Sequence, residues 1–139
     1  MSHISAAMLD RDWLGKTLGI EFPEATPERI VATMPVTPAH QQPFGYLHGG
    51  ASVALAESVA SVGGMLNAPP GKVVFGLEIN ANHVRPRRSG TLKAIGTPLH
   101  VGQTTQIWDI RIVDDDDKLV CVSHCTLAVV PIPSQGDPA

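Results

Sequence analysis

The stretch from Gly50 to Asn67 reads GASVALAESVASVGGMLN, and it decides the fold. It is built almost entirely from alanine, valine, leucine, serine and glycine, and Glu57 is its only charged residue. The run is too long for an ordinary strand, and small apolar residues on every side are typical of a helix that is buried nearly all round. We expect the helix to end at Asn67, because Pro69, Pro70 and Gly71 follow it.

Strand-like runs flank this helix. One run precedes it, and four follow it, at Arg29 to Pro35, Val73 to Val84, Leu92 to Val101, Thr104 to Val113 and Leu119 to Val130. Turn residues, including the acidic run Asp114 to Asp117, separate the runs, so the strands are expected to be joined by short turns. Short connections most simply give an antiparallel meander. A long helix packed on a curved antiparallel sheet is an α+β fold.

The segment before the first strand is expected to be helical. Apolar residues recur at roughly helical spacing in residues 7–19, which predicts a short opening helix. Pro38 and Pro43 predict a loop between Pro35 and Gly45, directly before the long helix.

Length and composition exclude several classes of protein. A chain of 139 residues is expected to form one domain over residues 1–139, without a DNA-binding appendage. Its formal net charge of −3 argues against nucleic acid as a partner. Charges at Asp10, Arg11 and Lys16 argue against a secretory signal or an anchor, and Glu57 and Pro69 interrupt the longest uncharged stretches. We therefore expect a cytoplasmic protein that does not enter membranes.

The two cysteines are predicted to be buried and unreactive. Cys121 and Cys125 lie in one strand-like run, which separates them by ~13 Å. A disulfide needs Cα atoms within roughly 7 Å, so the two cannot pair with each other. Their spacing also excludes a zinc site.

Glu57 is the residue on which a functional interpretation depends. Its neighbours, such as Ala54, Leu55 and Ala60, provide neither a positive charge nor an amide, and burying an unpaired carboxylate is costly. Such a group suits a general base or a nucleophile. Alternatively, the side chain reaches water or pairs with an arginine from elsewhere. Ser61, one turn later on the same face, could orient a water molecule for Glu57 or bond back to the Glu57 carbonyl.

His48, Gly49 and Gly50 form the start of the same helix. The first N–H groups of a helix have no partner within it, and the positive end of the helix dipole suits an oxyanion. Glycine also lets a carbonyl group approach the backbone closely. Alternatively, the glycines only permit a tight turn. Gln42, in the preceding loop, could donate its amide to the same carbonyl, or it could simply be solvated.

The spacing of Gly49 and Glu57 predicts an oligomer if both groups act on one bond. Their eight-residue separation corresponds to ~12 Å along a helix, which is too far for both to reach one carbonyl group. A two-fold dimer with two such helices antiparallel would place Gly49 of one subunit beside Glu57 of the other and would create two sites.

A cluster of arginines suggests a place for a phosphorylated ligand. Arg85, Arg87 and Arg88 lie close together at a strand end, although a solvated strand end explains them equally well. His83 precedes Arg85 by two residues and shares its strand face. No metal site is expected, because metal-ligand spacing is absent from the set His48, Glu57 and His83.

Three segments together resemble the hotdog-fold acyl-CoA thioesterases. They read QPFGYLHGGASVALAESVAS from Gln42 to Ser61, GLEINANHVRP from Gly76 to Pro86, and LHVGQTTQIW from Leu99 to Trp108. The likeness is greatest to bacterial 1,4-dihydroxy-2-naphthoyl-CoA thioesterases and to relatives acting on aryl-carrier-protein, hydroxybenzoyl or phenylacetyl thioesters. The resemblance implies a hotdog fold, in which a curved antiparallel sheet wraps a long central helix, and a tetramer made of two dimers.

The resemblance also assigns roles to residues. The family's base or nucleophile falls on Glu57, with Ser61 near the water, and the groups that polarise the thioester carbonyl fall on Gly49 and Gln42, beside His48. The family's CoA-binding segments fall on Gly76, on His83, Val84, Arg85 and Pro86, and on His100, Val101, Gly102, Gln103, Thr104 and Thr105. Relatives often carry an arginine where this chain has Gln103, which weakens the case for a phosphate contact there.

The leading hypothesis is hydrolysis of an acyl-CoA thioester with an aromatic acyl group, in which CoA is part of the substrate and no separate cofactor is needed. A carrier-protein thioester would present the same bond. One alternative is hydration or dehydration of a β-hydroxyacyl thioester, but the histidine and acid signatures of those hotdog enzymes are absent. The other is a non-catalytic acyl-CoA-binding module. Regulators of that kind carry a DNA-binding helix pair, for which the N-terminal segment leaves no room.

Overall fold

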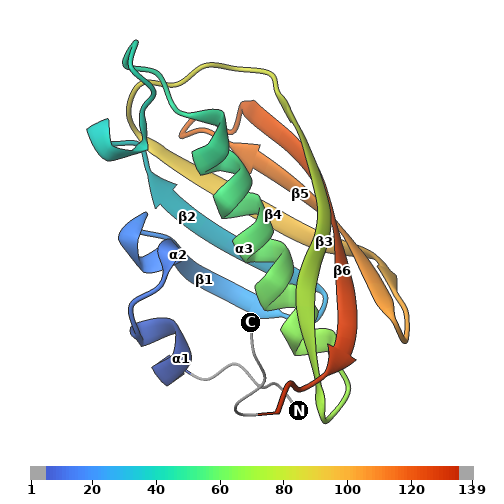
Figure 1. Ribbon diagram of the computed structural model, residues 1–139. Helices are drawn as coiled ribbons and strands as arrows, with labels where there is room; N and C mark the ends of the chain where they lie inside the picture. The colour runs from blue at the N-terminus through green and yellow to red at the C-terminus, as the bar shows by residue number, and fades with distance from the viewer. Residues whose placement is uncertain (1–5, 135–139) are drawn as a thin grey trace.

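The computed structural model describes residues 6–134, in which a six-stranded antiparallel sheet wraps one long helix (Figure 1). The strands lie across the sheet in the order β1-β2-β4-β5-β6-β3. This arrangement confirms the predicted α+β class. In chain order, with η1 a 3-10 helix, the elements are α1 (Ala6–Asp10), α2 (Leu14–Thr17), β1 (Glu21–Thr26), β2 (Arg29–Pro35), η1 (Pro38–His40), α3 (Gly49–Asn67), β3 (Lys72–His83), β4 (Thr91–Val101), β5 (Thr105–Val113) and β6 (Leu119–Pro131).

One face of α3 forms the core together with the sheet. Leu55, Ala56 and Val59 are fully buried, and Trp108 of β5 packs beneath the helix. Glycine is required at this contact, because a Cβ on Gly63 would lie 2.3 Å from the Trp108 ring. By length and composition α3 could also cross a membrane. Its place against the sheet identifies it instead as the core helix of this fold.

The other face of α3 is only half-buried, so the expectation of a helix buried nearly all round was wrong. Ala54, Glu57, Ser58, Ser61 and Met65 share this face and are all partly exposed. Small residues such as alanine and serine fit either environment, so the composition of the helix does not reveal which side meets the sheet. Glu57 therefore lies on the half-exposed side, away from the tightest packing.

The strands do not form the simple meander that was predicted. Strands β4, β5 and β6 are connected in that way, but β3 pairs with β6, from Lys72 opposite Pro131 to His83 opposite Cys121. The reason is that β2 pairs with β4 and occupies the edge that a meander would leave for β3. Within the described residues, β3 is therefore an edge strand with no neighbour on its outer side.

The N-terminal segment also differs from the prediction. Two short helices, separated at residues 11–13, replace the single helix expected over residues 7–19. Trp13 lies at the break: its Nε1–H donates to the Leu9 carbonyl at 3.0 Å, and its ring stacks on Phe22 with centroids 6.4 Å apart. Strand β1 was not predicted, because Pro23 interrupts its pattern. It is an edge strand, where proline is tolerated.

The two cysteines are buried and free, as predicted. Burial raises the pKa of both thiols. For Cys125 the pKa is raised to about 12, mainly by burial and further by the negative charges of Glu57 and Glu78. Because the thiolate is the reactive form of cysteine, these side chains act as small apolar residues in the core.

The turn predicted at Asp114 to Asp117 is present, and Asp114 organises it. Its Oδ1 accepts hydrogen bonds from the backbone N–H groups of Lys118 at 3.0 Å and Asp116 at 2.9 Å, and Arg87 Nη1 lies 3.2 Å from its Oδ2. The Lys118 N–H is the main cause that lowers the pKa of Asp114. Asp116, Arg87 and Arg85 act in the same direction, and burial of the carboxyl opposes them.

We expect Asp114→Asn to lower the Tm at neutral pH. A carboxyl group whose pKa is lower in the folded than in the unfolded chain stabilises the fold above its unfolded pKa, and this contribution is lost as the pH falls through the folded pKa. The Tm difference between variant and wild type should therefore shrink below about pH 4. Thermal unfolding across this range measures it, with Asp116→Asn, exposed in the same turn, as the control. A difference that does not change with pH would contradict this account.

Candidate active site

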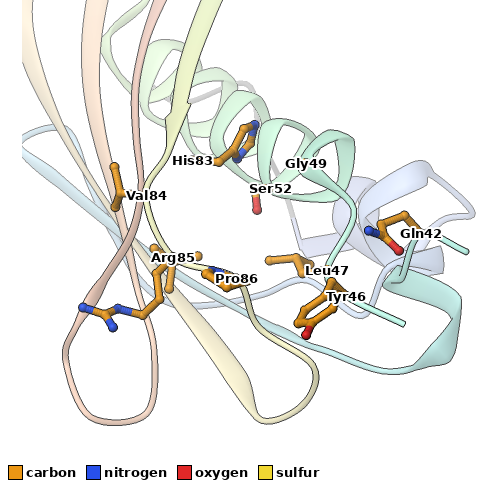
Figure 2. Close-up of a pocket in the computed structure, with 10 residues that line it drawn as sticks. Gln42, Tyr46, Leu47, Gly49, Ser52, His83, Val84, Arg85 and Pro86 are labelled. Atoms are coloured by element: carbon orange, nitrogen blue, oxygen red, sulfur yellow. The ribbon is translucent and has the colours of Figure 1, made fainter. Parts of the chain in front are cut away.

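A pocket of about 550 Å³ opens at the start of α3, and we call it the helix-start pocket (Figure 2). Its walls come from the loop before α3, the first turn of α3, the end of β3 and the start of β6. It brings together residues that are far apart in the sequence, among them Gln42, Gly49, Ser52, His83, Val84 and Arg85. Several residues that the sequence singled out separately thus share one site.

The start of α3 presents one free backbone donor. His48 is the N-cap residue: its Nδ1 accepts from the Gly50 N–H at 2.8 Å, and its carbonyl accepts from the Ala51 N–H at 3.0 Å. The Gly49 N–H has no acceptor among the described residues. A free N–H at the positive end of a helix is a donor for a developing negative charge. The His48 ring itself lines a neighbouring hollow with Gly50 and does not join the helix-start pocket.

The side chain of His83 lies close to residue 49. A Cβ on Gly49 would lie 2.9 Å from Nε2 of His83, which extends from the end of β3. Glycine at this position therefore lets the His83 ring lie against the start of α3, and a larger residue would force the ring to move.

Gln42 is oriented by its own loop. Its side-chain oxygen accepts from the Phe44 N–H, and its backbone N–H donates to the Tyr46 carbonyl at 2.8 Å. Because the oxygen is fixed by a donor, the other end of the amide must be the Nε2 group. No described residue accepts from Nε2, so the helix-start pocket has a second available donor.

Glu57 lies in a different pocket, of about 610 Å³, which we call the Glu57 pocket. It lies between the α1–α2 segment, the half-exposed face of α3 and the start of β3. The side chains that line it are mainly apolar, and they include Met8, Trp13, Val62, Met65 and Phe75. The pocket therefore combines a carboxylate with apolar walls.

The Glu57 carboxylate has no ion pair or hydrogen bond to any residue that the structure describes. The alternative that an arginine from elsewhere pairs with it is therefore not seen, although Arg11 lines the same pocket. The backbone of β3 passes close by, because a Cβ on Gly76 would lie 2.7 Å from Glu57 Oε1. Glu57 is thus half-buried, unpaired and held next to the edge strand.

Ser61 lines the same pocket as Glu57. It makes no hydrogen bond back to the Glu57 carbonyl, whereas Ser58 makes such a bond to the Ala54 carbonyl at 2.7 Å. The Ser61 hydroxyl is therefore available to a molecule in the Glu57 pocket, which fits the first of its two predicted roles.

Within one chain, the carboxylate and the free N–H lie in separate pockets that share no lining residue. This agrees with the separation estimated from their spacing along a helix. Chemistry that uses Glu57 and Gly49 on one bond would need two chains.

The arginine cluster is divided by its contacts. Arg87 is paired with the buried Asp114, and the Arg88 guanidinium lies 4.2 Å from the centre of the Tyr46 ring. These two arginines hold loops together. Arg85 is exposed at the helix-start pocket, and its only hydrogen bond to a described residue is a long one, 3.4 Å from Nε to the Leu119 carbonyl oxygen. Of the three arginines in the cluster, Arg85 is therefore the one available to contact a phosphate.

The remaining predicted CoA-binding residues lie elsewhere in the chain. Gly76 is in β3 against Glu57, and residues 100–105 form the tip of the β4–β5 hairpin, at the opposite end of the molecule from the start of α3 (Figure 1). A single chain does not bring this hairpin to Arg85. Among the described residues, no group of three His, Cys, Asp or Glu side chains is placed to hold a metal ion.

Sequence reasoning missed two parts of the site. Ser52 lines the helix-start pocket, but a serine in a helix rich in alanine and serine gives no signal beyond its three-residue spacing from Gly49. The α1–α2 segment forms one wall of the Glu57 pocket. The only sign of this in the sequence is the set of apolar residues Met8, Leu9 and Trp13, which need a surface to pack against.

Comparison with known proteins identifies the family. Residues 44–121 match the model of the Thioesterase superfamily. A 1,4-dihydroxy-2-naphthoyl-CoA hydrolase from Listeria monocytogenes is 47% identical over 116 residues, which cover 84% of this chain and 94% of that protein. A hydrolase of the same name from Escherichia coli is 48% identical over 113 residues, which cover 81% and 83%. A solved thioesterase from Haemophilus influenzae has a TM-score of 0.86 at 46% identity and covers 93% of this chain and 90% of its own.

The matched region contains Gly49, Glu57 and His83, so it includes part of the lining of each pocket as well as α3 and strands β3 to β5. The similarity in sequence and the similarity in fold both extend over most of the length of these relatives. We conclude that this chain belongs to the thioesterase superfamily and is a thioester hydrolase with the hotdog fold.

Proposed function

We propose that the enzyme hydrolyses acyl-CoA thioesters with an aromatic acyl group to the free acid and CoA. The observation that carries the proposal is an unpaired, half-buried carboxylate in an apolar pocket, combined with free donors in a second pocket that ends at an exposed arginine. The names of the Listeria and Escherichia coli relatives, which describe a naphthoyl-CoA substrate, support the aromatic acyl group.

In the proposed mechanism the thioester carbonyl accepts hydrogen bonds from the Gly49 N–H and from Gln42 Nε2. Both donors, and the positive end of α3, stabilise the negative charge that develops on the carbonyl oxygen. Glu57 of the facing subunit attacks the carbonyl carbon or removes a proton from a water that attacks it. In either form the C–S bond breaks and CoA leaves as the thiolate, which takes up the proton removed from water. When Glu57 itself attacks, water then hydrolyses the acyl–Glu57 anhydride to the free acid. Ser61 holds the water beside Glu57.

The open edge of β3 supports a dimer in which two chains complete each site. β3 has no strand on its outer side among the described residues, and it exposes Phe75 by 54% and Leu77 by 63%. Gly76 lies between these two residues, and a Cβ there would lie 2.7 Å from Glu57 Oε1, so a partner at this edge would lie near the carboxylate. Two-fold pairing along β3 satisfies the free edge and gives two equivalent sites. A tetramer of two such dimers remains part of the proposal, and light scattering coupled to gel filtration measures both.

The Glu57 pocket suits the acyl group. Its volume of about 610 Å³ lies within the range of small-molecule pockets, and aromatic and methionine side chains line it. We therefore test the proposal with a panel of aryl and aliphatic CoA thioesters compared by kcat/KM. A clear preference for aryl groups is expected, and a preference for straight aliphatic chains would overturn the aromatic part of the proposal.

Arg85 is expected to contact a phosphate of CoA. Arg85→Ala should raise KM for a CoA thioester about 5-fold, as for an exposed ion pair, and the effect should weaken as salt is added. The same acyl group on N-acetylcysteamine, which carries no phosphate, should show no change. Lys93→Ala, which removes a cation paired with Asp117 away from the pocket, serves as the control. Equal effects on both thioesters would show that Arg85 does not act through a phosphate.

The proposal also covers the location, cofactors and partners of the enzyme. The enzyme acts in the cytoplasm, needs no cofactor or metal, and has neither nucleic acid nor membrane as a partner. A carrier-protein thioester would present the same reacting bond. The exposed Arg85 favours CoA, because its nucleotide brings further phosphates to the rim of the pocket.

A further inference from the structure

Ser52 has an unpartnered hydroxyl in the wall of the helix-start pocket. The residue is 0% exposed, and its Oγ has no hydrogen-bond partner among the described residues. Within the described part of the chain it is the only buried hydroxyl without one. Helical serines commonly bond to the carbonyl four residues earlier, as Ser58 does, but Ser52 does not. A buried hydroxyl left unsatisfied is unfavourable, so the group is arranged for something other than the stability of the free protein.

The position of this hydroxyl is defined by the helix and the pocket. Figure 2 shows it pointing from α3 into the pocket, on the side of Leu47 and Pro86. Gly49 and Ser52 lie on the same side of α3, about 4.5 Å apart along its axis. The pocket therefore offers the free N–H of Gly49, then the Ser52 hydroxyl, and the Arg85 guanidinium at its rim.

We propose that Ser52 binds the first amide of the pantetheine arm, which CoA and carrier proteins share. This inference rests on the proposed function, in which Gly49 holds the thioester carbonyl. The amide nitrogen follows the thioester sulfur by three bonds, or about 4 Å, which matches the rise from Gly49 to Ser52. An amide that leaves water for this pocket needs a new hydrogen-bond partner, and the Ser52 hydroxyl needs one too. Binding satisfies both groups at once.

The test compares two thiols with one acyl group. The benzoyl thioester of N-acetylcysteamine keeps the amide, and the benzoyl thioester of butanethiol lacks it. Ser52→Ala should lower kcat/KM for the first roughly 3- to 10-fold, the effect of one neutral hydrogen bond, and should leave the second unchanged. The loss should appear mainly in KM, because the amide does not take part in bond breaking.

A stability measurement separates this role from a structural one. Ser52→Ala removes an unpartnered buried hydroxyl, so its Tm should equal or exceed that of the wild type. The matched control is Ser123→Ala. Ser123 is 1% exposed and lines neither pocket, and its Oγ donates to the Asn80 carbonyl at 2.7 Å. Its variant should have a lower Tm and an unchanged ratio of kcat/KM between the two thioesters.

Two results would overturn the proposal. An equal loss of kcat/KM with both thioesters would show that Ser52 only maintains the shape of the pocket. No loss with either thioester would show that the amide binds elsewhere. These outcomes are independent of the aromatic preference. That preference is measured on the wild type across acyl groups at one thiol, whereas the role of Ser52 is measured on its variant across thiols at one acyl group.

Discussion

Glu57→Gln should lower kcat by about 10²- to 10⁴-fold while the protein stays folded. Glutamine has nearly the same shape as glutamate, but it can neither accept the proton of the attacking water nor form a covalent bond with the acyl group. Stability should change little, because the Glu57 carboxylate makes no ion pair or hydrogen bond with the described residues. Release of free thiol from an aryl-CoA thioester measures the rate, and thermal unfolding measures stability.

The control for this variant is Glu28→Gln. Glu28 is an exposed carboxylate between β1 and β2, so its loss removes the same charge without touching either pocket or the β3 edge. Glu28→Gln should be as active as the wild type. Wild-type rates for Glu57→Gln would refute the mechanism, and a large drop in Tm would point instead to a structural role for the carboxylate.

A single turnover in ¹⁸O-water distinguishes the two forms of the mechanism. If Glu57 forms an anhydride with the acyl group, water that attacks at the Glu57 carbonyl leaves the label in the Glu57 carboxylate. If Glu57 acts as a general base, the label enters only the product acid. Mass spectrometry of the peptide that contains Glu57 reads the difference.

Gly49→Ala should lower kcat/KM by about 100-fold, close to the effect of removing one oxyanion donor. The added Cβ would lie 2.9 Å from His83 Nε2 and would stand where the thioester must approach the free N–H. His83 could move to relieve the first contact, but the second would remain. Steady-state kinetics with an aryl-CoA thioester measure the loss.

The double variant Gly49→Ala with His83→Ala separates these two effects. It removes the contact between the new methyl group and the ring but leaves the methyl group beside the N–H. If access to the N–H matters, the double variant should stay far less active than His83→Ala alone, although its Tm returns toward that of the wild type. Recovery of activity would show that the only cost of the methyl group is the clash with His83.

The helix and the strand runs could be predicted from the sequence, whereas the order of the strands could not. The bounds of α3 and of β2 to β6 agree with the expected runs to within one residue, because proline, glycine and aspartate mark the ends clearly. The position of β3 depends on β2 pairing with β4, a long-range contact that no local pattern specifies. Pro23 concealed β1 for a similar reason, since it is tolerated only because β1 lies at an edge.

The candidate site could be predicted in part for a related reason. Glu57 and Gly49 stand out because each is unusual in its surroundings, one a charge in an apolar helix and the other a glycine at its start. The spacing of the two also predicted that one chain keeps them apart, and they lie in different pockets. Ser52 could not be identified, because its unpartnered state exists only once the helix has packed against the sheet.

The separation of the two pockets has a genetic consequence. Suppose that each working site takes its N–H donor from one subunit and its carboxylate from the other. A chain with a damaged helix start then lacks the donor, whereas a chain with a damaged carboxylate lacks only Glu57. A mixed pair of such chains contains one site with both defects and one site with none. Two inactive alleles of this protein would then complement each other, which two alleles damaged in the same pocket could never do.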